Sequence, residues 1–246
     1  MTIAANLEEI RERIAGAARR AVRAPDEVAL MAVSKTHPAA AIAEAMAAGQ
    51  SLFGENRVQE FADKREELGA AFGGASSGGA RFHLIGHLQS NKAARAAELF
   101  DSIDSVDSLR LAERLNEAAA RLNRQLAVLI EINIGGEAAK SGVDPGSDQL
   151  RALLETQARL PNLTICGFMT VPPFTPEPEG ARVFFRLLRQ LRDRLRASSG
   201  LALDELSMGM SHDFEVAIEE GSTCVRVGTA IFGARPHKVA DEETSR

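Results

Sequence analysis

The sequence predicts an α/β fold, a single (β/α)8 TIM barrel with an extra N-terminal helix. Eight short apolar segments with strand character alternate with helical segments along the 246 residues, and eight is the number that such a closed barrel needs. The run from Leu126 to Ile130 is apolar at every position, which is typical of a parallel strand covered by helices. No Gly-x-Gly-x-x-Gly pattern follows the first strand, so an open dinucleotide-binding sheet is disfavoured.

The elements follow from periodicity and from capping residues. An amphipathic helix opens the chain, from about Leu7 to Val22, and Ser211 suits the N-cap of the last long helix. A Gly- and Ser-rich stretch at 69–80 and a Pro-rich stretch at 171–178 predict surface loops. The predicted strands are 28–34, 51–54, 82–85, 102–105, 127–132, 164–168, 205–207 and 224–227. The predicted helices between and after them are 39–48, 58–68, 92–99, 109–122, 148–159, 179–196 and 214–220.

Composition and charge are those of an ordinary globular protein. Apolar residues make up 45% and charged residues 26%, and the length suffices for one barrel domain at 1–236 with a polar tail at 237–246. A net charge of −5 offers no basic surface for nucleic acid, and no apolar run approaches the ~20 residues of a membrane span. The N-terminus lacks the basic and apolar regions of a signal peptide. We therefore expect a cytoplasmic monomer that binds neither nucleic acid nor a membrane.

The cysteines and histidines predict no metal centre. Cys166 and Cys224 are isolated in apolar segments without a Cys-x-x-Cys pair, so we expect buried free thiols rather than a disulfide. His83 and His87 are four residues apart, but no third ligand stands nearby and the segment is not helical.

In a TIM barrel, ligands lie at the C-terminal ends of the strands, and phosphate is often held by the loops after strands seven and eight. Two segments at these places combine glycine with hydroxyl residues, namely 207–211 and 228–229. Glycine lets backbone N–H groups approach an anion closely, so the two segments predict a phosphate cradle. The predicted cradle residues are Ser207, Gly209, Ser211, Gly228 and Thr229.

Lys35 ends the first predicted strand, and taken alone it would be interpreted as a solvent-exposed lysine. An amine in the same fold as a phosphate cradle indicates a phosphorylated aldehyde held as a Schiff base, and the obvious candidate is pyridoxal 5′-phosphate (PLP). Lys140 is a second amine near the rim, for which a charge on a flexible loop is the stronger interpretation. Asn56, His83 and Met169 also fall at or just beyond predicted strand ends, with His83 pointing into the barrel mouth.

Arg226 places a charge inside an apolar strand, so its guanidinium requires a partner. That partner is either an acidic group in a structural ion pair or the pyridine nitrogen of the cofactor. In the second case the guanidinium can only donate, and the ring nitrogen stays neutral. A neutral ring is a poorer electron sink than a pyridinium, which argues against transamination or decarboxylation.

Long blocks spaced along nearly the whole chain carry a family resemblance; they are 32–35, 53–60, 83–92, 140–142, 167–170, 206–211 and 217–233. They resemble the YggS/PROSC family of pyridoxal-phosphate homeostasis proteins. The resemblance implies a barrel related to the N-terminal domain of alanine racemase, with PLP on Lys35, that buffers the cofactor or delivers it to PLP-dependent apo-enzymes without catalysing a reaction. The predicted cofactor-binding residues are Lys35, Asn56, His83, Met169, Ser207, Met210, Ser211, Arg226, Gly228 and Thr229.

Two other functions compete with a PLP carrier. An amino-acid racemase of the same cofactor class needs an acid–base group on the face opposite the lysine, which the resemblance would assign to a tyrosine. The chain contains no tyrosine, although a histidine or lysine could substitute in principle. A phosphate-binding barrel of another chemistry would leave Lys35 unexplained. The sequence therefore favours the carrier.

Overall fold

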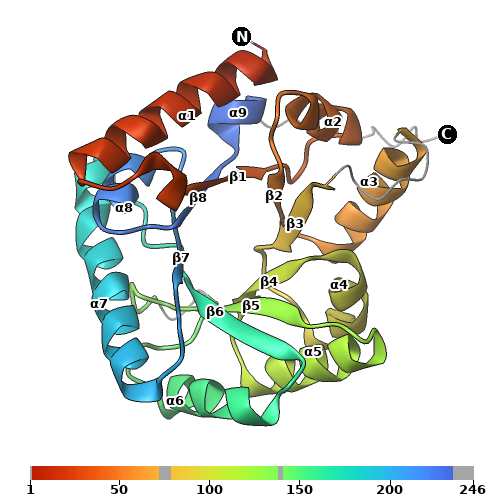
Figure 1. The fold of residues 1–246 in the computed structure, drawn as a ribbon, viewed down its shortest axis with the longest axis vertical. Helices are drawn as coiled ribbons and strands as arrows, with labels where there is room; N and C mark the ends of the chain where they lie inside the picture. The colour runs from red at the N-terminus through yellow and green to blue at the C-terminus, as the bar shows by residue number, and fades with distance from the viewer. Residues whose placement is uncertain (1, 72–78, 138–140, 235–246) are drawn as a thin grey trace, which may run out of the picture.

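The computed structural model describes residues 2–71, 79–137 and 141–234, whose strands form a closed barrel inside a ring of helices (Figure 1). Each strand runs parallel to the next strand in the sequence, and β8 closes the barrel against β1. The strands are β1 (Ala29–Val33), β2 (Leu52–Glu55), β3 (Arg81–Leu84), β4 (Ser102–Val106), β5 (Leu126–Glu131), β6 (Leu163–Met169), β7 (Glu205–Met210) and β8 (Cys224–Val227).

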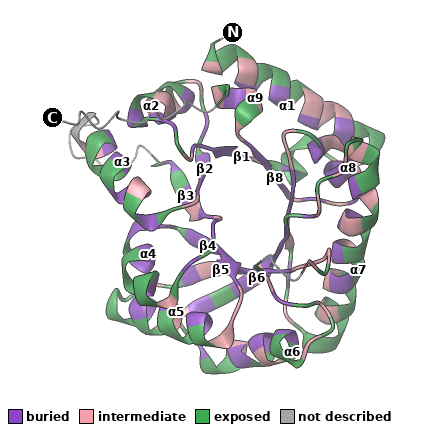
Figure 2. Cartoon of the chain, turned by 180° about the vertical axis from the view of Figure 1, so that it is seen from behind, coloured by how far each residue is buried: buried purple, intermediate pink, exposed green. Residues whose placement is uncertain are grey.

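Helices cover the outer face of the barrel. Figure 2 shows buried positions along the strands and on the helix faces turned toward them, with exposed positions on the outside. Short 3-10 turns lie at Pro25–Glu27, Ser90–Lys92, Thr156–Arg159 and Pro178–Ala181. The α-helices are α1 (Ile3–Arg20), α2 (Ala39–Ala47), α3 (Val58–Ala71), α4 (Ala93–Leu99), α5 (Leu109–Arg121), α6 (Asp148–Glu155), α7 (Arg182–Ser199), α8 (Phe214–Glu219) and α9 (Thr229–Phe232).

The predicted barrel with its extra N-terminal helix is confirmed, and every predicted strand overlaps an observed one. The helix predicted at 179–196 begins as a 3-10 turn and continues as α7, and α3 extends past Leu68 to Ala71. Most of the predicted loop at 69–80 and the whole predicted tail at 237–246 lie outside the described residues.

The end of β7 and the start of α8 differ from the prediction. β7 continues to Met210 because Gly209, at φ +94°, lets the strand approach α8 closely; a Cβ there would lie 2.6 Å from the Cβ of Ala217. The predicted N-cap, Ser211, is wrong. Asp213 occupies that position, and its Oδ1 accepts a hydrogen bond of 2.7 Å from the N–H of Met210.

The core has an outer layer between strands and helices and a small floor inside the barrel. In the outer layer, Phe53, Phe61, Phe82 and Phe100 form a chain of contacts with ring centroids 4.6–5.3 Å apart. Such aromatic pairs contribute about 0.5–1.5 kcal/mol each beyond the burial of their area. The floor consists of Met31, Leu52 and Cys224, with Ile85 packed against them.

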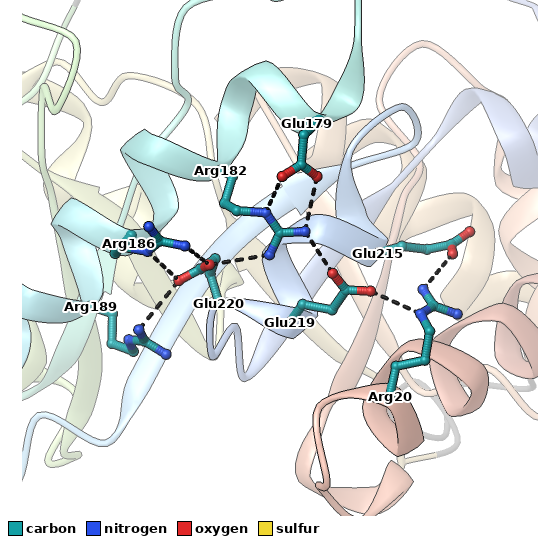
Figure 3. Close-up of polar contacts among 8 residues, drawn as sticks. All are labelled: Arg20, Glu179, Arg182, Arg186, Arg189, Glu215, Glu219 and Glu220. Atoms are coloured by element: carbon teal, nitrogen blue, oxygen red, sulfur yellow. Dashed lines mark hydrogen bonds and ion pairs between the residues drawn. The ribbon is translucent and has the colours of Figure 1, made fainter.

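α1 packs against α8, α9 and α2, and so covers the side of the barrel where β8 meets β1 (Figure 1). An ion-pair cluster joins α1 and α8 to α7 (Figure 3). At its centre, Glu220 is only 5% exposed at its side chain and accepts from three arginines of α7. The cluster comprises Arg20, Glu179, Arg182, Arg186, Arg189, Glu215, Glu219 and Glu220.

Both cysteines are free thiols, as expected. Cys224 is buried, but the predicted burial of Cys166 is wrong: it is half-buried, near Glu205 at the start of β7, and its desolvation still raises the pKa of the thiol to about 11. In the ranges given above, no helix is both long and apolar enough to cross a bilayer. Within the same residues, no three His, Cys, Asp or Glu side chains gather in a way that could hold a metal ion.

Candidate functional site

The lysine predicted to react stands at the C-terminal end of β1. Lys35 is half-buried and lies two residues beyond Val33, the last residue of the strand. Thr36, which follows it, has a φ of +66°, an uncommon conformation for a residue that is not glycine. The N–H of Thr36 donates to Glu60 Oε1 over 2.6 Å, and this bond holds the turn in place.

A buried polar network supports this turn from behind; we call Ser34, Glu55, Glu60 and Lys64 the Lys64 network. Lys64 Nζ lies 2.9 Å from the carbonyl oxygen of Ser34 and 2.8 Å from both Glu55 Oε1 and Glu60 Oε1. Ser34 Oγ also donates to Glu55 Oε1 over 2.8 Å. Because Ser34 and Thr36 flank Lys35, the network fixes the backbone on both sides of it.

The two carboxyl groups of the Lys64 network differ in their electrostatics. Glu55 is fully buried, and desolvation raises its pKa although the Lys64 ammonium acts in the opposite direction. For Glu60, burial also favours the neutral acid, but the hydrogen bonds from Lys64 and from the N–H of Thr36 outweigh it and lower the pKa. Sequence reasoning missed this network. The available signals were a carboxylate ending a buried strand and the i,i+4 spacing of Glu60 and Lys64.

Arg226 is held by neutral oxygens. Its Nη1 donates to the carbonyl oxygen and the hydroxyl of Ser207 over 2.6 and 2.8 Å, and its Nη2 donates to the carbonyl oxygen of Thr170 over 2.7 Å. Desolvation lowers the pKa of Arg226, which is only 4% exposed. In the described part of the chain the hydrogen-bonded partners are therefore not acidic, so the structural ion-pair interpretation is wrong. None of these bonds uses Nε.

The end of β8 comes close to the end of β1. A Cβ on Gly228 would lie 3.2 Å from the carbonyl oxygen of Val33, so only a residue without a side chain fits there without displacement. α9 begins immediately afterwards, and its first internal hydrogen bonds run from the N–H groups of Ile231 and Phe232 to the carbonyl oxygen of Gly228. Among the described residues, the N–H groups of Thr229 and Ala230 take no part in these helical hydrogen bonds.

At the end of β7, some residues support the fold and others lie near the barrel mouth. Ser207 is fully buried and holds Arg226, which explains its hydroxyl without a ligand. Gly209 makes room for α8 rather than for an anion. Met210 pairs with Arg226 across the strands, and Ser211, the first residue beyond β7, is half-buried at the rim.

His83 does not lie at the barrel mouth. Its Nδ1 is 3.1 Å from Asp104 Oδ2, and Arg81 and Glu205, which begin β3 and β7, act on it electrostatically. The side chain of His83 therefore faces the barrel interior, where it meets Asp104 of β4. Burial lowers the pKa of His83, but attraction to the Asp104 carboxylate outweighs this and raises it.

The sequence profile of the alanine racemase N-terminal domain matches residues 5–236. The chain belongs to this family. A relative from Escherichia coli (strain K12), called pyridoxal phosphate homeostasis protein, is 46% identical over 243 residues and covers 96% of this chain and 97% of its own length. The protein of the same name from Aquifex aeolicus (strain VF5) is 43% identical over 237 residues, with coverages of 96% and 100%. The resemblance seen in the sequence blocks is thus confirmed.

Solved structures of the family share the fold. PipY of Synechococcus elongatus PCC7942 matches with a TM-score of 0.82 and 41% identity over 94% of this chain and 100% of PipY, both without PLP and with PLP bound. The alanine racemase of Corynebacterium glutamicum matches with a TM-score of 0.70, and at 19% identity this shows the fold alone.

In this member of the alanine racemase N-terminal-domain family, most of the predicted site residues meet at one end of the barrel. Asn56, directly after β2, lines a pocket there, and Met169 ends β6 beside Ser207. His83 stands apart from them inside the barrel, and Lys140 lies outside the described residues. The residues at or close to the barrel mouth are Lys35, Asn56, Met169, Ser207, Met210, Ser211, Arg226, Gly228 and Thr229.

Proposed function

We propose that the chain binds PLP as a Schiff base on Lys35 and takes part in PLP homeostasis by buffering the cofactor or delivering it to apo-enzymes, without catalytic turnover. The observation that carries the proposal is the close approach of Gly228 to Val33, which brings the N–H groups at the start of α9 next to the strand that bears Lys35. The names of the relatives and the PLP-bound form of PipY support it.

The residues at the mouth fit the chemical groups of PLP. The backbone N–H groups of Thr229 and Ala230, with the hydroxyl groups of Thr229 and Ser211, supply donors for a phosphate. Arg226 is held through Nη1 and Nη2, and Nε is left to donate to a ring nitrogen. When bound, the cofactor supplies an aldehyde carbon that a primary amine attacks, and Lys35 is the amine at that end of the barrel.

The same residues favour a carrier over a racemase. A guanidinium donates and keeps its proton, so a ring nitrogen facing Arg226 stays unprotonated and stabilises a carbanion poorly. Racemisation also needs an acid–base group on each face of the cofactor, and the chain has no tyrosine to act opposite Lys35. We therefore propose that the protein holds and releases the cofactor but does not racemise amino acids.

Borohydride reduction followed by peptide mapping tests this function. The cofactor should be trapped on the peptide that contains Lys35 and should be lost in Lys35→Ala, whereas Lys92→Ala, which removes an exposed lysine, should trap normally. Trapping at full strength on another peptide would refute the assignment. Racemisation of L-alanine that survives repurification and disappears in Lys35→Ala would refute the absence of turnover.

A further inference from the structure

The pocket that Asn56 lines opens at the barrel mouth, among the ends of β2, β3, β5 and β6 and the loops that follow them. Its volume is about 260 Å³. Ile85 and Val171 give it apolar walls, while Asn56, His87, Ser141 and Glu131 give it polar ones. Arg226 and Gly228, which the proposed function assigns to PLP, do not line it. It shares Asn56 with the predicted PLP site and so adjoins that site, where it can hold a second group beside the cofactor.

Glu131, the last residue of β5, contributes the feature that needs an explanation. The residue is only 8% exposed, and its Oε1 accepts a hydrogen bond of 2.9 Å from the hydroxyl of Ser141. Its Oε2 is buried and has no hydrogen-bond partner among the residues that the structure describes. A buried carboxyl oxygen without a donor costs about 1–3 kcal/mol or more, so a ligand that brings a donor would recover this free energy.

The charges around Glu131 leave room for a cationic donor. Desolvation raises its pKa, and the Asp107 carboxylate adds to this effect. The hydroxyl of Ser141 and the positive charges of Arg226 and His87 act in the opposite direction. Neither cation reaches the carboxyl group: Arg226 is bonded to Ser207 and Thr170, and His87 Nδ1 lies 3.1 Å from Asp107 Oδ2.

We propose that this pocket is a subsite for the primary ammonium group of an amine, which Glu131 Oε2 binds, and that it receives the amine to which the cofactor is handed. The proposal about cofactor transfer rests on the proposed function; the binding of an ammonium group does not. An ammonium group supplies the missing N–H donor and the opposite charge, and the side chains of Ile85 and Val171 suit the carbon chain next to it.

Glu131 would also balance the protons when one amine replaces another. The incoming ammonium group gives one proton to the Glu131 carboxylate, and its nitrogen then forms a bond to the aldehyde carbon of the cofactor. A second proton passes directly from this nitrogen to the Lys35 nitrogen, and the C=N bond to Lys35 is replaced by a C=N bond to the incoming nitrogen. The Lys35 nitrogen then takes the first proton back from Glu131 and leaves as an ammonium group, so two protons move, one C=N bond replaces another and nothing is oxidised or reduced.

Titration of the cofactor-free protein with methylammonium, followed by NMR of its backbone amides at mildly alkaline pH, tests the pocket alone. We expect saturable shifts at Asn56, Ile132 and Ser141 that disappear in Glu131→Gln. Glu205→Gln is the matched control. Burial also raises the pKa of Glu205, but this residue begins β7 and lies away from the pocket. Tetramethylammonium, which has no N–H donor, should not bind. Absence of saturation, or the same shifts in Glu131→Gln, would overturn the proposal.

The rate at which PLP leaves Lys35 for an added primary amine, followed by absorbance, tests the transfer step. Proton transfer by a positioned side chain contributes about 100-fold or more, so Glu131→Gln should slow the exchange by about that factor, and Glu205→Gln should not. An unchanged rate in Glu131→Gln would overturn the transfer role. Failure of borohydride trapping at Lys35 in the wild-type protein would instead refute the proposed function, while the methylammonium titration would still decide the pocket.

Discussion

Replacing Lys64 with methionine tests whether the Lys64 network stabilises the barrel at the reactive lysine. Methionine keeps most of the volume of the lysine side chain but removes the ammonium group. That group lies within 2.9 Å of the Ser34 carbonyl oxygen and the carboxyl groups of Glu55 and Glu60. The substitution leaves Glu55, which is fully buried, without a neutralising cation.

The expected magnitude follows from this burial. Removing one partner of a buried ion pair costs about 3–5 kcal/mol, because the remaining charge stays buried without compensation. Since the free energy of unfolding of a natural domain is about 5–15 kcal/mol, Lys64→Met should be strongly destabilised. Adding Glu55→Gln removes the uncompensated charge, so the double variant should be more stable than Lys64→Met alone.

The pH dependence has a definite sign. Burial already raises the pKa of Glu55, and loss of Lys64 raises it further because the ammonium group acts to lower it. An acid whose pKa is raised in the folded state binds its proton more readily there than in the unfolded chain. The deficit of Lys64→Met should therefore be largest at neutral pH. It should shrink as the pH falls through the raised pKa of Glu55.

Denaturant unfolding followed by far-ultraviolet circular dichroism measures these free energies, since the chain has no tryptophan or tyrosine for intrinsic fluorescence. Borohydride trapping on the same variants reports whether the turn around Lys35 is still formed. A loss below about 1 kcal/mol in Lys64→Met, or a double variant as unstable as the sum of the two single ones, would refute the reasoning.

Two further predictions concern the end of β8 and the helices outside the barrel. Gly228 has a negative φ of −114°, so Gly228→Val does not meet the strain of a left-handed backbone, but its side chain meets the Val33 carbonyl oxygen. Binding of PLP should therefore weaken at least about tenfold more than binding of pyridoxal, and equal losses measured by equilibrium titration would place the phosphate elsewhere. Arg182→Ala removes ion pairs to Glu219 and Glu220 and should lower the free energy of unfolding by about 1 kcal/mol. The loss of stability should be smaller at high salt, and a loss that salt does not change would argue against an electrostatic origin.

The sequence predicted the elements well because their signals are local. Alternating apolar strands and amphipathic helices reveal a barrel one segment at a time. The predicted end of β7 was wrong because two contacts made in the folded chain decide where the strand ends. The carboxyl group of Asp213 turns back to the N–H of Met210, and Gly209 packs against Ala217. Neither contact can be inferred from the local sequence pattern, in which Ser211 is the better candidate for the N-cap.

The site was predictable only where one residue type carries the chemistry. A lysine after an apolar strand and a glycine before a hydroxyl residue were correctly placed beyond the ends of β1 and β8, while the roles of Lys35 and Gly228 stay predictions. Apart from the i,i+4 pair of Glu60 and Lys64, the partners of Lys64 and Glu131 depend on which strands and helices meet in space, so the sequence spacing does not predict them. His83 shows the converse problem. Its position close to the end of a predicted strand suggested that the side chain points into the barrel mouth, but the side chain turns inward to Asp104.

Glu55 and Glu131, two buried carboxyl groups at this end of the barrel, differ in a way that separates support from function. In the described residues, Oε2 of both Glu55 and Glu131 lacks a hydrogen-bond partner. The charge of Glu55 already faces the Lys64 ammonium group, and the whole residue is buried. Glu131 has only a neutral hydroxyl on its other oxygen and lines an open pocket. A carboxyl group that only stabilises a fold is better served by a cation from the same chain, as at Glu55. Among the described residues no cation bonds to Glu131, and this favours an amine from outside.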